Sequence, residues 1–83
     1  MVKGRVQGVN YRATTQGKAH ELNLTGFVRN LNNGNVYIEA EGEQDNLNKF
    51  IDWCYIGSPR AKVSEVNSVE GELRNFRTFE VRK

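Results

Sequence analysis

The 83-residue sequence has few of the residue types that build disulfides, metal centres and membrane spans. Its one cysteine, Cys54, excludes an internal disulfide and any metal site made of several cysteines. No apolar run approaches the ~20 residues of a membrane-spanning helix, and no segment resembles the apolar core of a signal peptide. We therefore expect a cytoplasmic protein with no membrane partner.

The charged residues and the single histidine exclude further classes. His20 has no metal-ligating residue at a suitable spacing apart from the adjacent Glu21, so we interpret it as a surface residue and expect no metal site. The net charge is +2, from twelve Lys and Arg against ten Asp and Glu. Basic residues near the C-terminus are interleaved with glutamates, which is typical of a mixed-charge surface, and we expect no nucleic-acid partner.

The length leaves room for one small hydrophobic core, so we expect residues 1–83 to form a single domain and a monomer. Apolar and polar residues alternate over residues 2–6, which predicts a strand. From Tyr11 to Leu22 the apolar side recurs at helical spacing, which predicts a helix that is followed by an exit segment at residues 23–25 and stopped by Gly26. Gly17 interrupts this helix at a cost of about 1 kcal/mol relative to alanine, so we expect it to lie close against a sheet.

Short sequence patterns also predict the secondary structure of the rest of the chain. Asn33 and Gly34 form the turn of a predicted hairpin, because this pair adopts the positive φ angles that tight turns require. The predicted elements are strands at 27–31 and 35–41, a helix around 47–54 that stops at Gly57, a bulged strand within 61–69, and a last strand at 78–82. This order predicts an α+β ferredoxin-like split βαβ sandwich, β-α-β-β-α-β plus a C-terminal strand, with two helices on one face of a mainly antiparallel sheet.

The segment between the first strand and the first helix is the best candidate for a binding site. A glycine breaks the strand, and Arg12 falls in the first turn of the helix. Free N–H groups at a helix start attract a phosphate-sized anion, and a guanidinium can donate two hydrogen bonds to it. The candidate donors are the amides of Gln7, Gly8, Val9, Asn10, Tyr11 and Arg12. The local pattern leaves open a simple tight turn with a solvent-facing arginine.

Asn30 is a second candidate, because it lies near the end of a strand, where asparagine is uncommon. Its amide both donates and accepts hydrogen bonds, so it can hold a water molecule in line with a phosphorus atom. The alternative is an ordinary residue beside an asparagine-rich turn. We interpret Cys54 as a buried core thiol, and Glu39 and Glu41 as part of an exposed sheet face rather than a catalytic pair.

Together these residues resemble a known family. The segment Gly4-Arg5-Val6-Gln7-Gly8-Val9-Asn10-Tyr11-Arg12 resembles the acylphosphatase signature G-x-V-Q-G-V-x-[FY]-R. Residues 26–31, followed by 33–36 and 39–42, are similar to the second motif of that family, and residues 57–61 and 76–79 also match in kind and position. The resemblance covers nearly the whole chain.

The resemblance implies the same split βαβ fold and the hydrolysis of small-molecule acyl phosphates to a carboxylate and inorganic phosphate, with no metal or cofactor. It assigns the grip on the phosphoryl group to Arg12, the positioning of the attacking water to Asn30, and the phosphate cradle to the amides of residues 7–12. Asn10 stands where the family usually has a small residue, and asparagine tolerates the unusual φ angles of such a loop. The rival interpretation is a non-catalytic ferredoxin-like module that binds an anion or RNA.

Overall fold

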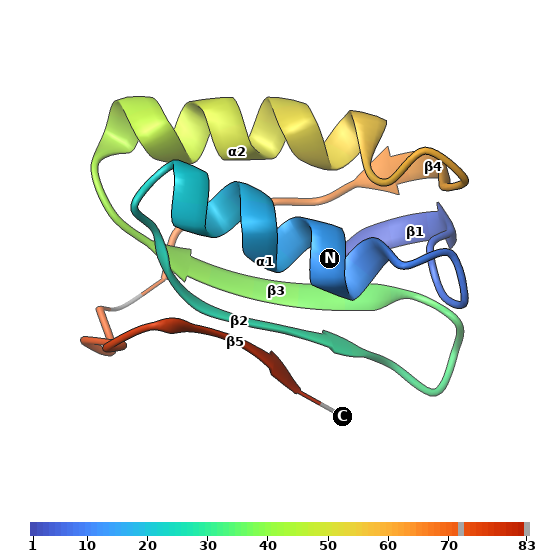
Figure 1. The fold of residues 1–83 in the computed structure, drawn as a ribbon, viewed down its shortest axis with the longest axis horizontal. Helices are drawn as coiled ribbons and strands as arrows, with labels where there is room; N and C mark the ends of the chain where they lie inside the picture. Colours follow the sequence, from blue (N-terminus) through green and yellow to red (C-terminus); the bar gives the residue numbers. More distant parts are fainter. Residues whose placement is uncertain (72, 83) are drawn as a thin grey trace.

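The computed structural model describes residues 1–71 and 73–82 and has two helices on one face of a five-stranded sheet (Figure 1). The strand order is β4-β1-β3-β2-β5; β2 and β5 are parallel, and the other neighbouring pairs are antiparallel. The predicted fold class is confirmed. The elements are β1 (Val2–Arg5), α1 (Tyr11–Glu21), β2 (Thr25–Asn30), β3 (Val36–Glu41), α2 (Gln44–Ile56), β4 (Lys62–Val66) and β5 (Phe79–Arg82).

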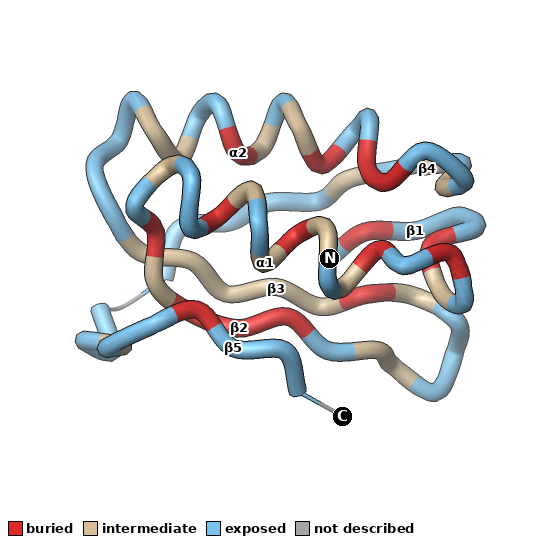
Figure 2. Tube along the Cα trace, viewed as in Figure 1, coloured by how far each residue is buried: buried red, intermediate tan, exposed pale blue. Residues whose placement is uncertain are grey.

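The core lies between the helices and the sheet, where the buried positions of both layers face each other (Figure 2). Alternation along the strands places Val28 and Val36 on this side, and both are fully buried. The helices contribute one stripe each, with Tyr11 and Ala19 from α1 and the predicted Phe50 and Cys54 from α2. His20 is exposed, as predicted.

The start of β2 and the middle of α1 differ from the sequence predictions. The helix α1 ends at Glu21, and Asn23 (φ 56°) turns the chain, because asparagine tolerates the left-handed conformation. Gly26 does not end the helix but lies within β2, where a Cβ atom would collide with the backbone of Glu39. The prediction that Gly17 packs closely is also wrong: it is exposed, and a Cβ atom there would meet nothing within 4 Å.

The bulge predicted within residues 61–69 is present. Lys3 pairs with Glu65 and Gly4 pairs with Val63, so Ser64 is the extra residue of β4. The strand ends at Val66, which makes it shorter than the segment predicted from the valines.

The open face of the sheet carries a second, smaller cluster around Phe27. The ring of Phe27 lies 5.9 Å from that of Tyr37 and 5.8 Å from that of Phe76. Glu39 and Glu41 do not form a catalytic carboxylate pair, but their face of the sheet is less exposed than predicted, because both side chains are partly buried and accept hydrogen bonds. Glu39 accepts a hydrogen bond from Tyr37, and Glu41 accepts backbone N–H groups of residues 74–76, which lowers the Glu41 pKa. Residues 74–76 lie shortly before β5 in the chain.

Candidate active site

The loop between β1 and α1 lies at the end of the sheet where β2 also ends (Figure 1). Gly8 (φ 70°) and Asn10 (φ 62°) both adopt the left-handed conformation, which glycine and asparagine tolerate best. Asn10 is the N-cap of α1, and its side chain does not cap the helix. The first turn contains no acidic residue, so its N–H groups and the positive end of the helix dipole favour an anion there.

Arg12 lies in the first turn of α1, where a cation is unfavourable for the helix by itself. Its Nη1 atom donates a hydrogen bond to the carbonyl oxygen of Arg82 at 3.0 Å. This bond ties the guanidinium to the end of β5, while the flat guanidinium group has further N–H donors for a phosphoryl group. The Arg12 side chain is therefore anchored to the end of β5 rather than extended freely into solvent.

Asn30 is the last residue of β2 and points to the helix side of the sheet, because it lies two residues beyond the core residue Val28. Its Oδ1 atom is buried and has no hydrogen-bond partner among the described residues. Leaving such an atom unpaired costs about 1–3 kcal/mol. A buried acceptor of this kind is available to a water molecule or a ligand, which makes Asn30 a candidate functional residue.

Asn30 lies between the backbone carbonyl groups that accept hydrogen bonds from Arg12 and from Gln7. In the parallel pair of β2 and β5, Arg82 lies opposite Arg29, so the carbonyl group that accepts from Arg12 is next to the residue before Asn30. On the other side, Nε2 of Gln7 donates to the carbonyl oxygens of Leu31 (2.7 Å) and Asn35 (2.8 Å). The loop, Arg12 and Asn30 therefore meet at one corner of the molecule.

The side-chain contacts that hold the loop in place have no signal in the sequence. The family motif points to Gln7 only for its backbone amide, yet its side chain ties the loop to the hairpin. Ser58 Oγ donates to the carbonyl oxygen of Val9 at 2.7 Å, so the turn after α2 supports the loop from the opposite side. These partners are 24 to 49 residues apart in the chain, and no local pattern marks such a contact.

Tyr11 and Cys54 connect the loop to the core. The Tyr11 hydroxyl donates to the carbonyl oxygen of Cys54 at 3.0 Å, in the last turn of α2, where carbonyl groups lack helical partners. Burial raises the pKa of both groups, and that of the Cys54 thiol reaches about 11. A protonated, buried thiol is a weak nucleophile, so the interpretation of Cys54 as a core residue is confirmed.

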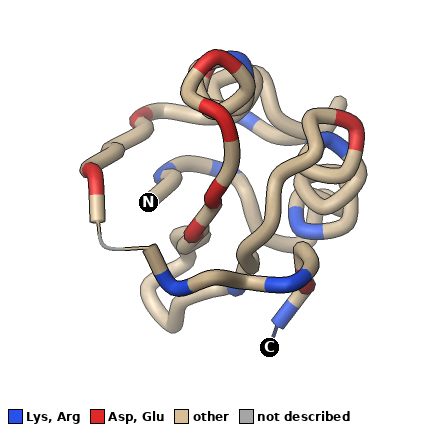
Figure 3. Tube along the Cα trace, turned by 90° about the vertical axis from the view of Figure 1, so that its left-hand side faces the viewer, with Lys and Arg blue, Asp and Glu red and all other residues tan. Residues whose placement is uncertain are grey.

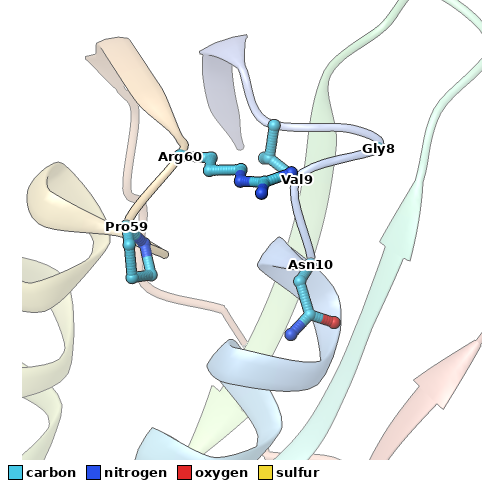
Figure 4. Close-up of a pocket in the computed structure, with 5 residues that line it drawn as sticks. All are labelled: Gly8, Val9, Asn10, Pro59 and Arg60. Carbon is cyan, nitrogen blue, oxygen red and sulfur yellow. The ribbon is translucent and has the colours of Figure 1, made fainter.

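A surface hollow of about 330 Å³ lies beside the loop (Figure 4). Gly8, Val9 and Asn10 form one wall, and Pro59 and Arg60 form the other. Neither Arg12 nor Asn30 lines it. Among residues 1–71 and 73–82, no three His, Cys, Asp or Glu side chains are grouped as metal ligands. Within the same residues, neither α1 nor α2 has the length and apolar composition of a membrane-spanning helix.

Comparison with known proteins gives one consistent result. The family model described as acylphosphatase matches residues 1–81. The acylphosphatases of Acaryochloris marina and Marinobacter nauticus are 47% and 51% identical to the chain, over 98% and 94% of its length and 87% and 89% of theirs. The structure of an acylphosphatase from Coxiella burnetii superimposes with a TM-score of 0.95 at 43% identity, covering 98% of this chain and 85% of that one.

Proposed function

Since this chain belongs to the acylphosphatase family, we propose that residues 7–12 hold the phosphoryl group of its substrate and that Asn30 orients the attacking water. The enzyme hydrolyses small-molecule acyl phosphates to a carboxylate and inorganic phosphate. The observation that carries the assignment is the buried Oδ1 atom of Asn30, which has no partner among the described residues and lies at the corner where Arg12 and the loop meet.

The proposed reaction is an in-line displacement at phosphorus. The amides of Gln7, Gly8, Val9, Asn10, Tyr11 and Arg12 and the Arg12 guanidinium hold the phosphoryl oxygens and stabilise the charge that builds up on them. Water held by Asn30 forms the new P–O bond while the bond to the acyl oxygen breaks, and the carboxylate leaves with the electron pair. The acyl phosphate has a good leaving group, so positioning and electrostatics supply the catalysis without a metal or cofactor.

The proton of the attacking water goes to an oxygen of the phosphoryl group. Within the described residues, the side-chain hydrogen bonds of Arg12 and Gln7 go to backbone carbonyls, so neither side chain is joined to a carboxylate or imidazole that would act as a base. Asn30 itself does not ionise and serves to orient the water.

The proposal extends to the domain organisation, location and partners of the enzyme. Residues 1–83 act as a single cytoplasmic domain and as a monomer, and the partner is a small molecule rather than a nucleic acid. RNA-binding sheets of this architecture use exposed aromatic side chains for stacking. On the open face of this sheet, Tyr37 bonds to Glu39, and the Arg82 guanidinium covers the Phe27 ring at 4.1 Å. That face therefore does not support the RNA-binding alternative.

Gln7 is expected to act as a positioning residue. Replacing it with methionine, which has similar length but no N–H donors, should lower kcat for benzoyl phosphate by roughly tenfold, because small misplacements of reacting groups are costly. The matched control is Gln16→Met, which removes one hydrogen bond from a side-chain amide to the carbonyl oxygen of Phe79, outside the loop. Steady-state kinetics should separate the two variants. Equal kcat values for both would contradict a positioning role for Gln7.

A further inference from the structure

The hollow beside the loop has a basic wall that the proposed reaction does not use. Figure 4 shows the Arg60 side chain extending from the turn before β4 toward Val9, across the hollow from Asn10. The other lining residues are Gly8 and Pro59, so none of the described acidic side chains contributes to the walls. The volume of about 330 Å³ is enough for a small organic group.

The surroundings of Arg60 are also basic. Arg5 and Lys62 lie opposite each other in the β1–β4 pair, and Lys62 is two residues beyond Arg60. None of the ion pairs among the described residues involves these three cations. At the opposite end of the molecule, acidic and basic positions are mixed (Figure 3). The end that carries the loop therefore presents positive charge beside the hollow.

The position of the hollow fits the geometry of the proposed reaction. In-line attack places the leaving acyl oxygen on the side of phosphorus opposite the water. Asn30 belongs to β2, whereas Arg60 precedes β4, and β1, from which the loop emerges, lies between these two strands in the sheet. The hollow therefore lies toward β4, away from Asn30 on β2, and an acyl group that leaves opposite the water would extend in this direction.

We propose that this hollow is the acyl-group subsite and that Arg60 selects acyl phosphates whose acyl group carries a second negative charge. The inference rests on the proposed function, because it takes the phosphoryl position from the loop and the water position from Asn30. A guanidinium at the rim of a small hollow recognises a carboxylate or phosphate of the acyl group by charge and by paired hydrogen bonds. A neutral acyl group would enter the hollow without using Arg60.

The test compares two substrates of similar shape, benzoyl phosphate and its para-carboxy derivative. Wild-type enzyme should prefer the carboxylated substrate by about tenfold in kcat/KM at low salt, and the preference should shrink as salt is added. Arg60→Gln should abolish the preference by lowering kcat/KM for the carboxylated substrate, with benzoyl phosphate hydrolysis within about twofold of wild type. Arg60→Lys should retain part of the preference, because it keeps the charge but not the planar donor pair.

The matched control is Arg77→Gln, which removes an exposed arginine of the segment before β5. This variant should leave kcat/KM unchanged for both substrates. The proposal is wrong if wild-type enzyme shows no preference, or if Arg60→Gln leaves the preference intact. It is also wrong if Arg60→Gln slows both substrates equally, which would indicate general attraction of the phosphoryl group. A failure of the proposed function gives a different result, namely benzoyl phosphate hydrolysis that does not depend on Arg12.

Discussion

Replacing Arg12 with alanine is expected to lower kcat/KM for benzoyl phosphate by a factor of about 100 or more. The variant loses a charged donor to the phosphoryl oxygens, and removal of one such donor in a transition state costs roughly 3 kcal/mol. Among the described residues, the Arg12 side chain makes a single hydrogen bond, to the carbonyl oxygen of Arg82. That bond is solvent-exposed, so the free energy of unfolding should change little. Steady-state kinetics together with urea unfolding would separate the two effects.

Two further variants sharpen this result. Arg12→Lys keeps the charge but loses the planar donor pair, and its kcat/KM should fall between those of wild type and Arg12→Ala. Arg29→Ala is the matched control, because Arg29 precedes Asn30 in β2 but is exposed, with its guanidinium 5.7 Å from the centre of the Tyr37 ring. If Arg12→Ala and Arg29→Ala have equal activity, Arg12 does not bind the reacting phosphoryl group.

Replacing Asn30 with alanine is expected to reduce kcat about 100-fold without destabilising the protein. The reaction loses the group that orients the water, and the reacting atoms are then less often aligned. The substitution also removes a buried oxygen that has no partner among the described residues, so the free energy of unfolding should stay constant or rise by about 1 kcal/mol. An enzyme that becomes slower and no less stable is the signature expected of a residue kept for catalysis.

The control for Asn30 is Asn32→Ala, an exposed asparagine of the hairpin turn, which should retain full activity. Asn30→Asp keeps the size of the side chain but places a negative charge beside the phosphoryl group, so it should also be slow. Wild-type kcat in Asn30→Ala would show that water is oriented by another group. A large loss of stability in that variant would instead indicate a structural role.

The elements of the fold could be predicted because their signals are local. The predicted β2–β3 hairpin is present, although only Gly34 of the Asn33-Gly34 pair has a positive φ (91°), and the apolar stripe that includes Phe50 and Cys54 defines α2. The exit from α1 at residues 23–25 could be predicted, but the residue that turns the chain is Asn23 and not Gly26. The role of Gly26 depends on the backbone of Glu39 in the neighbouring strand, and a sequence does not show which strands are neighbours.

The sequence named the candidate residues, whose roles stay a prediction, but it did not indicate the contacts that hold them in place. The motif singled out Arg12 and Asn30, and the strand order explains why residues 18 positions apart in the chain reach the same corner. The contacts of Gln7 and Ser58 with distant carbonyl groups depend on the folded chain and have no sequence signal. For the same reason, nothing in the sequence placed Arg60 beside the loop.

The most direct test of the central claim follows the oxygen of the attacking water. Benzoyl phosphate should be hydrolysed by wild-type enzyme in heavy-oxygen water with EDTA present, and both products analysed by mass spectrometry. If water held by Asn30 attacks phosphorus, inorganic phosphate gains one heavy oxygen and benzoate gains none. Heavy oxygen in benzoate would mean attack at the carbonyl carbon, and it would contradict the proposed roles of the loop, Arg12 and Asn30.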